Sequence, residues 1–210
     1  MVKLPFVRIN VFGDSIAWGK GDLVRGGWVN RLKIELYRLN RFLEVTNVSV
    51  GGDTTKTLLE RFEFEARQRE PHIVIFAIGI NDSQFYRDPD NHPVSLEEYR
   101  SNIKDLISAA RGLTDKILMI GLSRVDERKT RPIYEITNTH YTNEEIEKYD
   151  EVLKNTAEEI GLVYIPVSDL LEIDDLPDGL HVAGSGHEKI AKRVKQVLLA
   201  SYPDLLYTDV

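Results

Sequence analysis

The chain has no cysteine among its 210 residues, which excludes disulfides, thiolate metal sites and cysteine nucleophiles. It also lacks an apolar run of about 18 residues, the length that a membrane-spanning helix needs. The N-terminal segment is interrupted by Pro5, Arg8 and Asn10 and is followed by no small-residue cleavage site, so we expect no signal peptide. These absences favour a soluble protein of the cytoplasm.

Positive charge is also in short supply. The chain has 27 Lys and Arg residues against 34 Asp and Glu residues, which gives a formal net charge of −7. Nucleic acids and anionic membranes bind basic faces, so this balance argues against both as partners. The length and the content of 42% hydrophobic and 29% charged residues suit one globular α/β domain over residues 1–210. The sequence leaves the formation of a homo-oligomer open.

Short apolar runs alternate with helical patterns along the chain. Five of these runs predict strands, at residues 7–12, 43–50, 72–79, 116–122 and 162–167. Helix starts are predicted where a serine or threonine precedes a glutamate by three residues, as at Ser95, Thr142 and Ser185. The alternation predicts a parallel sheet with helices on both faces.

Polar residues gather where the predicted strands end. The segments are Gly13-Asp14-Ser15, Gly51-Gly52-Asp53, Gly79-Ile80-Asn81-Asp82 and, before the last helix, Asp178-Gly179-Leu180-His181. Ligands bind at the carboxyl ends of the strands in an open parallel sheet, so we expect these segments to converge there. The long segment 123–141 leaves the same edge, and a loop of that length is usually functional or mobile. Candidates for apolar pocket walls are Trp18, Tyr86, Tyr134 and Tyr141.

These residue types suit acyl transfer. Ser15 is a candidate nucleophile, and a serine needs a base within hydrogen-bond reach. His181 can be that base at neutral pH, and Asp178, three residues earlier, can orient it and stabilise its charged form. The oxyanion then needs positioned donors. The candidates are the backbone N–H groups of Ser15 and Gly52, next to a helix expected to begin at Asp53 or Thr54, and the side-chain amide of Asn81. Asp14 and Asp82 are interpreted as loop organisers, and His187 as a surface or packing residue.

Four segments of the chain resemble the defining blocks of the SGNH hydrolases, also called GDSL esterases or lipases. They are "FGDSIAWG", "NVSVGGDTT", "GIND" and "DGLH". The resemblance implies that Ser15, Asp178 and His181 form a catalytic triad, with Gly52 and Asn81 in the oxyanion hole. It also implies a three-layer α/β/α sandwich around a five-stranded parallel sheet, in agreement with the alternation above. The first block has isoleucine after Gly-Asp-Ser where the family has leucine. The segment 123–141 matches no family-wide motif, so the substrate and a lid role of this segment stay open.

The sequence therefore predicts a serine esterase that needs neither cofactor nor metal. It would hydrolyse a small carboxylic ester through an acyl-enzyme, the substrate being a short-chain acyl ester, a thioester or an acetylated sugar. The alternative is a non-catalytic, flavodoxin-like module that binds a small molecule or nucleotide at the same sheet edge. Such a module has no need of Asp178 and His181 at their D-x-x-H spacing.

Overall fold

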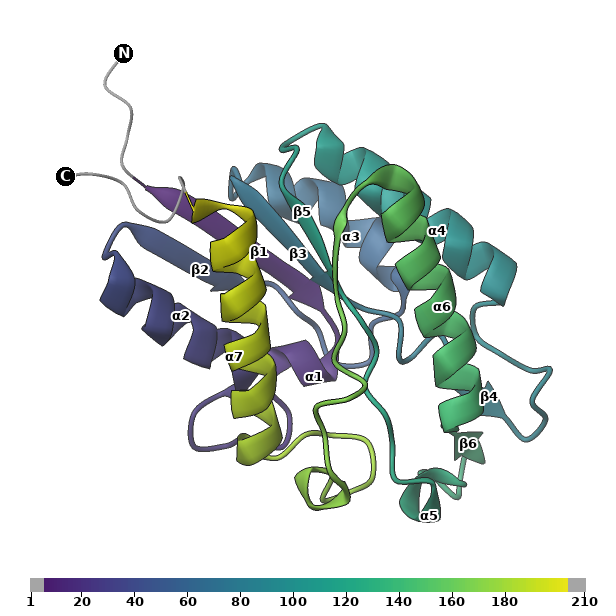
Figure 1. The fold of residues 1–210 in the computed structure, drawn as a ribbon. Coiled ribbons are helices and arrows are strands. Elements are labelled where there is room, and N and C mark those ends of the chain that lie inside the picture. Colours follow the sequence, from purple (N-terminus) through teal and green to yellow (C-terminus); the bar gives the residue numbers. More distant parts are fainter. Residues whose placement is uncertain (1–5, 204–210) are drawn as a thin grey trace.

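The computed structural model describes residues 6–203, and its core is a five-stranded parallel sheet (Figure 1). The strand order is β2-β1-β3-β5-β7, in which each neighbouring pair is parallel. The strands are β1 (Val7–Gly13), β2 (Leu43–Asn47), β3 (Ile73–Ala77), β5 (Ile117–Ile120) and β7 (Val163–Ile165). The five predicted strands are thus present, each within a few residues of its expected bounds.

Helices cover both faces of this sheet. One face carries α2 (Gly27–Leu39) and α7 (Gly184–Ser201), and the other carries α3 (Thr55–Arg67), α4 (Leu96–Arg111) and α6 (Asn143–Ile160) (Figure 1). Successive residues of a strand face opposite sides. Val11 therefore lies in the core under α2 and α7, whereas Phe12 packs edge-on against Phe62 of α3, with 4.8 Å between ring centroids. The predicted fold class, a flavodoxin-like three-layer α/β/α sandwich, is confirmed.

Two of the three predicted capping residues are N-caps of their helices. Ser95 accepts a hydrogen bond from the backbone N–H of Glu98, and Thr142 accepts one from Glu145. The prediction at Ser185 is wrong, because α7 begins at Gly184 with Ala183 as its N-cap. Ser185 already lies in the first turn, and its hydroxyl donates to the buried Asp175 at 2.5 Å.

Several short elements were not predicted from the sequence. They are α1 (Ser15–Trp18), α5 (Glu127–Thr130), the 3₁₀ turn η1 (Ile173–Asp175) and an antiparallel pair formed by β4 (Phe85–Tyr86) and β6 (Thr139–His140). Figure 1 shows α1, α5 and the β4–β6 pair on the side toward which the central arrows point. The segment 123–141 thus contains α5 and β6, and these elements surround the edge where the polar segments end.

Candidate active site

Ser15 follows the end of β1 and is the first residue of α1. Asp14 is the N-cap of this short helix, and its carboxylate accepts a hydrogen bond from the backbone N–H of Ile16 at 2.9 Å. Gly13 is required for a close approach between strands, since a Cβ there would lie 2.4 Å from the carbonyl oxygen of Ala77. The turn therefore delivers the Ser15 side chain at the carboxyl edge of the sheet.

The structure brings Ser15, His181 and Asp178 into one hydrogen-bonded chain. Ser15 Oγ lies 3.0 Å from His181 Nε2, although the two residues are 166 positions apart. His181 Nδ1 lies 2.6 Å from Asp178 Oδ2. The other carboxylate oxygen of Asp178 accepts the backbone N–H of His181 at 2.7 Å. Both links have the separation expected of a nucleophile, its base and the group that orients the base.

Burial and hydrogen bonding set the protonation states of His181 and Asp178. His181 is only 4% exposed, whereas the side chain of Asp178 is 48% exposed. Burial lowers the pKa of His181 below its ordinary value, and the neighbouring Asp178 partly offsets this effect. Burial raises the pKa of Asp178, but the hydrogen bonds from His181 and from the backbone N–H of Leu180 together outweigh it and leave that pKa below its ordinary value. At pH 7 the imidazole is therefore neutral and the carboxylate ionised, so His181 can accept a proton.

The loop after β2 runs beside Ser15. An ideal Cβ on Gly51 would lie 3.8 Å from the Cβ of Ser15. Gly52 has a φ of +87° and no atom within 4 Å of the position of its absent Cβ, so its backbone borders open space. The next residue, Asp53, is held by Arg61, whose Nη2 lies 2.5 Å from Oδ2. Helix α3 begins at Thr55 with Thr54 as its N-cap, slightly later than expected.

Asn81, in the loop after β3, is tied to this β2 loop. Its Nδ2 donates to the backbone carbonyl of Asp53 at 2.9 Å, and this leaves one of the two amide hydrogens for another acceptor. Asp82 links the same loops, since its carboxylate accepts from the backbone N–H of Thr55 at 3.0 Å and from the Thr55 hydroxyl at 2.5 Å. Ser15, Gly52 and Asn81 thus lie in adjacent, mutually bonded loops.

A sequence model of the GDSL-like lipase/acylhydrolase family matches residues 11–189. This range includes all four motifs at the sheet edge. The chain belongs to this family. The resemblance inferred from the motifs is therefore confirmed, as is the prediction that the protein is a carboxylic ester hydrolase.

The curated relatives of this GDSL-family chain include esterases whose sequence identity to it is low. The isoamyl acetate-hydrolyzing esterase 1 homolog of Rattus norvegicus is 26% identical over 201 residues, which cover 89% of this chain and 79% of that protein. Esterase TesA of Pseudomonas aeruginosa is 28% identical over 112 residues, covering 53% of this chain and 52% of that protein. Both support membership of the family.

Solved structures share the fold. The lipase/acylhydrolase of Enterococcus faecalis superposes with a TM-score of 0.75 at 22% identity, covering 93% of this chain and 97% of that one. A variant of Axe2, an acetyl-xylooligosaccharide esterase of Geobacillus, gives 0.72 at 21% identity, covering 90% and 93%. At these identities the likeness shows that the sandwich architecture is common to all three.

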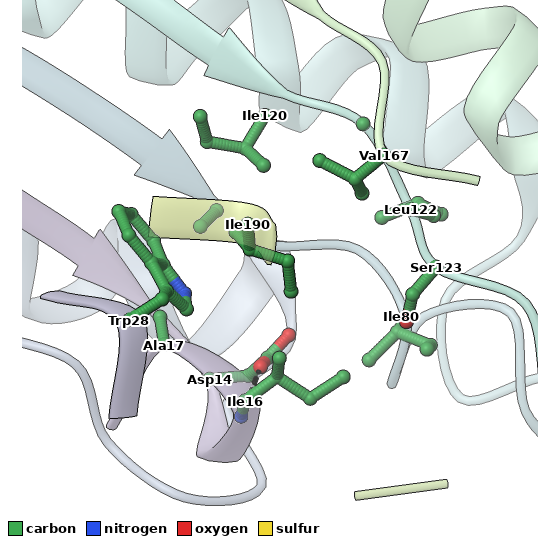
Figure 2. A pocket seen from close by; sticks show the side chains of 12 residues that line it. Asp14, Ile16, Ala17, Trp28, Ile80, Ile120, Leu122, Ser123, Val167 and Ile190 are labelled. Carbon is green, nitrogen blue, oxygen red and sulfur yellow. Dashed lines mark hydrogen bonds between the residues drawn. The ribbon is translucent and has the colours of Figure 1, made fainter. Parts of the chain in front are cut away.

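A small cavity lies on the inner side of the Ser15 turn (Figure 2). Its volume is about 30 Å³, room for one or two water molecules. Asp14 and Ser123 are its polar side chains, and Figure 2 shows them among apolar ones that include Ile80, Ile120 and Val167. Ser15 is not part of its wall, so the cavity is separate from the Ser15–His181 contact. Asp14 is 3% exposed, and burial raises the pKa of its carboxyl group to about 7.

The raised pKa of Asp14 predicts a pH-dependent stability difference for Asp14→Asn. The unfolded chain loses this proton near pH 3.8 and the folded chain near pH 7, so ionisation of Asp14 destabilises the fold as the pH rises between these values. The amide cannot ionise. The Tm of the variant relative to the native protein should therefore increase from about pH 4 to about pH 7 and then level off. A Tm difference that is constant over this range would contradict the buried-carboxyl explanation.

The remaining histidines and acids give no sign of a metal site. Residues 6–203 contain no group of three or more His, Asp or Glu side chains placed to hold an ion. His187 is fully buried, accepts the backbone N–H of Trp28 at Nδ1 and lies 3.2 Å from the carbonyl oxygen of Lys20 at Nε2. It therefore packs α7 against α2.

In the same described range, no helix combines the length and apolar character needed to cross a membrane.

The sequence did not reveal that segment 123–141 supports the D-x-x-H turn. The backbone N–H of Asp126 donates to the carbonyl of Gly179 at 2.8 Å, and Lys129 Nζ donates to that of Pro177 at 3.1 Å. Gly179 has a φ of +91°, and a Cβ there would lie 2.7 Å from the Lys129 Cβ. These partners are about 50 residues apart and carry no shared motif, so only the folded chain shows the contact.

Proposed function

We propose that this protein hydrolyses small carboxylic esters through an acyl-enzyme formed on Ser15. The observation that carries the proposal is the chain of hydrogen bonds from Ser15 Oγ to His181 Nε2 at 3.0 Å and from His181 Nδ1 to Asp178 Oδ2 at 2.6 Å. As Ser15 Oγ attacks the acyl carbon, His181 Nε2 takes the hydroxyl proton. Asp178 stabilises the imidazolium that results.

The same histidine completes both halves of the reaction. The imidazolium gives its proton to the leaving alcohol as the C–O bond of the ester breaks, and the acyl group stays on Ser15. Neutral His181 then takes a proton from a water molecule that attacks the acyl carbon. Collapse of this second tetrahedral intermediate releases the carboxylic acid and returns the proton to Ser15.

The negative charge of each tetrahedral intermediate would be stabilised by three donors. They are the backbone N–H groups of Ser15 and Gly52 and the remaining amide hydrogen of Asn81. Support comes from the open space at Gly52 and from the bond between Asn81 and Asp53, which holds the two loops together. Loss of one such donor typically costs about 3–4 kcal/mol of transition-state stabilisation.

The relatives favour an acetyl or other short acyl group on the acid side of the ester. One is an isoamyl acetate-hydrolyzing esterase homolog, and another is an acetylxylan esterase. Structures of that Geobacillus esterase with a serine, an aspartate or a histidine replaced by alanine are described as catalytic mutants. We infer a small acyl ester as substrate, with thioesters and acetylated sugars as the related classes.

A substrate panel tests this function. It consists of p-nitrophenyl acetate, butyrate and octanoate, acetyl-coenzyme A, and an acetylated xylo-oligosaccharide, each measured with the native protein and with Ser15→Ala as the blank. We expect turnover that is fastest for the acetyl and butyryl esters. If no substrate is hydrolysed faster by the native protein than by the variant, the proposal is wrong.

Activity is expected to rise with pH as His181 loses its proton. Because burial lowers the pKa of His181, the midpoint of kcat/KM should lie below the ordinary histidine value of 6.5, with a plateau at higher pH. The positive charge of Lys20 contributes to the lowering, so Lys20→Met should move the midpoint upward. The measurement is kcat/KM from pH 5 to 8 for both proteins, and a flat profile would argue against His181 as the base.

A further inference from the structure

The hydroxyl of Tyr141 lies among side-chain amides next to the candidate oxyanion site. Tyr141 stands between β6 and Thr142, the N-cap of α6, and is 3% exposed. Its oxygen lies 2.8 Å from Asn81 Oδ1 and 2.9 Å from Gln84 Oε1. The sequence suggested only an apolar wall at this position, but the phenol is part of a polar network.

Two contacts on opposite sides fix the orientation of the Asn81 amide. Nδ2 donates to the carbonyl oxygen of Asp53, and Oδ1 accepts from the Tyr141 hydroxyl. If the amide were flipped, Asn81 Oδ1 would take the place of Nδ2, about 2.9 Å from the Asp53 carbonyl oxygen. Two oxygens that can only accept would then face each other without a hydrogen between them. The pair of contacts therefore selects the orientation in which Nδ2 is on the side of the Asp53 loop.

The direction of the Tyr141 hydrogen bond follows from its neighbours. Gln84 Nε2 donates to the Tyr86 hydroxyl at 3.2 Å, which leaves Gln84 Oε1 facing Tyr141. The phenol thus meets two amide oxygens, both of which only accept, so its oxygen is the donor to both and its one hydrogen is shared between them. Burial also raises the pKa of Tyr141, so the phenol keeps this hydrogen throughout the working pH range.

The backbone around Tyr141 is held on both sides. Its N–H donates to the carbonyl of Thr130 at 3.0 Å, and the Thr130 hydroxyl donates to the carbonyl of Tyr141 at 2.7 Å. The preceding His140 stacks on Phe85 across the β4–β6 pair, with 5.0 Å between ring centroids. Segment 123–141 thereby presents the phenol in a defined position.

We propose that Tyr141 is a positioning residue for ester hydrolysis, because its hydroxyl holds the Asn81 amide with its remaining N–H directed at the developing oxyanion. The inference rests on the proposed function. A donor to the oxyanion acts mainly in the transition state, so misorientation of Asn81 lowers kcat and leaves KM nearly unchanged.

Tyr141→Phe tests the inference, because it keeps the ring and removes only the hydroxyl. We expect kcat to fall about 10-fold, less than the roughly 100- to 1000-fold loss from Asn81→Ala, with KM changed by less than about twofold. The matched control is Tyr149→Phe. It also removes a buried phenol hydroxyl, bonded to the carbonyl of Val94 at 2.6 Å, and should lower Tm without lowering kcat.

A double-mutant cycle separates positioning from a general structural effect. In the Asn81→Ala background, Tyr141→Phe should change kcat by less than about twofold, since the amide on which it acts is gone. The inference is wrong if Tyr141→Phe alone keeps kcat within twofold of the native value, or if it lowers kcat by the same factor in both backgrounds. Failure of the proposed function would look different, because Ser15→Ala would then keep full ester hydrolysis.

Discussion

Replacing Ser15 with alanine is expected to lower kcat for ester hydrolysis by roughly 10⁴-fold or more, with no change of fold. Ser15 Oγ is the atom proposed to bond to the acyl carbon while His181 accepts its proton, and the methyl of alanine cannot replace it. The loss should appear for every ester that the native protein hydrolyses. The far-UV circular dichroism and Tm should stay close to native values, because within residues 6–203 the Ser15 hydroxyl makes a single hydrogen bond, to His181.

Ser123→Ala is the matched control for this variant. Ser123 is also a buried serine at a strand end, and its hydroxyl has no hydrogen-bond partner within residues 6–203. It lines the inner cavity and is not part of the hydrogen-bonded chain. We expect its kcat to stay within about twofold of the native value. If Ser15→Ala keeps more than a few per cent of native activity, Ser15 is not the nucleophile.

His181→Ala should lower kcat by a factor similar to that of Ser15→Ala. A serine hydroxyl is a poor nucleophile unless a base accepts its proton, and His181 Nε2 is the base within 3.0 Å. The two residues act as a unit, so the Ser15→Ala/His181→Ala double variant should lose no more activity than either single variant. If kcat of the double variant instead falls by the product of the two single-variant factors, the two residues act independently.

The fold was predictable where a local pattern decides it. The apolar runs located β3 and β5, because strands buried on both faces consist almost wholly of apolar residues. The caps at Ser95 and Thr142 were predictable because each side chain accepts a hydrogen bond from a backbone N–H only three residues later. The expected cap at Ser185 is absent because α7 begins one residue earlier, at Gly184, and the Ser185 hydroxyl instead donates to Asp175, which lies outside the helix. The two-residue strands β4 and β6 are too short to produce a periodicity.

The site was predictable to the extent that its residues follow strand ends. Parallel strands bring their carboxyl ends to one edge, which is why Ser15, Gly52 and Asn81 could be expected in adjacent loops. The role proposed for Tyr141 could not be assigned in this way, because it depends on which atom its hydroxyl meets. That contact is set by β6, by the Thr130 backbone and by the orientation of Gln84, none of which has a sequence signature.

The most direct test of the central claim is the site of covalent labelling by a fluorophosphonate. The probe phosphorus should be attacked by Ser15 Oγ as fluoride leaves, and intact mass spectrometry of the native protein should show one adduct per chain. Peptide mapping should place this adduct on Ser15, and Ser15→Ala should remain unlabelled. A protein that hydrolyses esters but forms no adduct, or forms it on another residue, would contradict the assignment of Ser15 as the nucleophile.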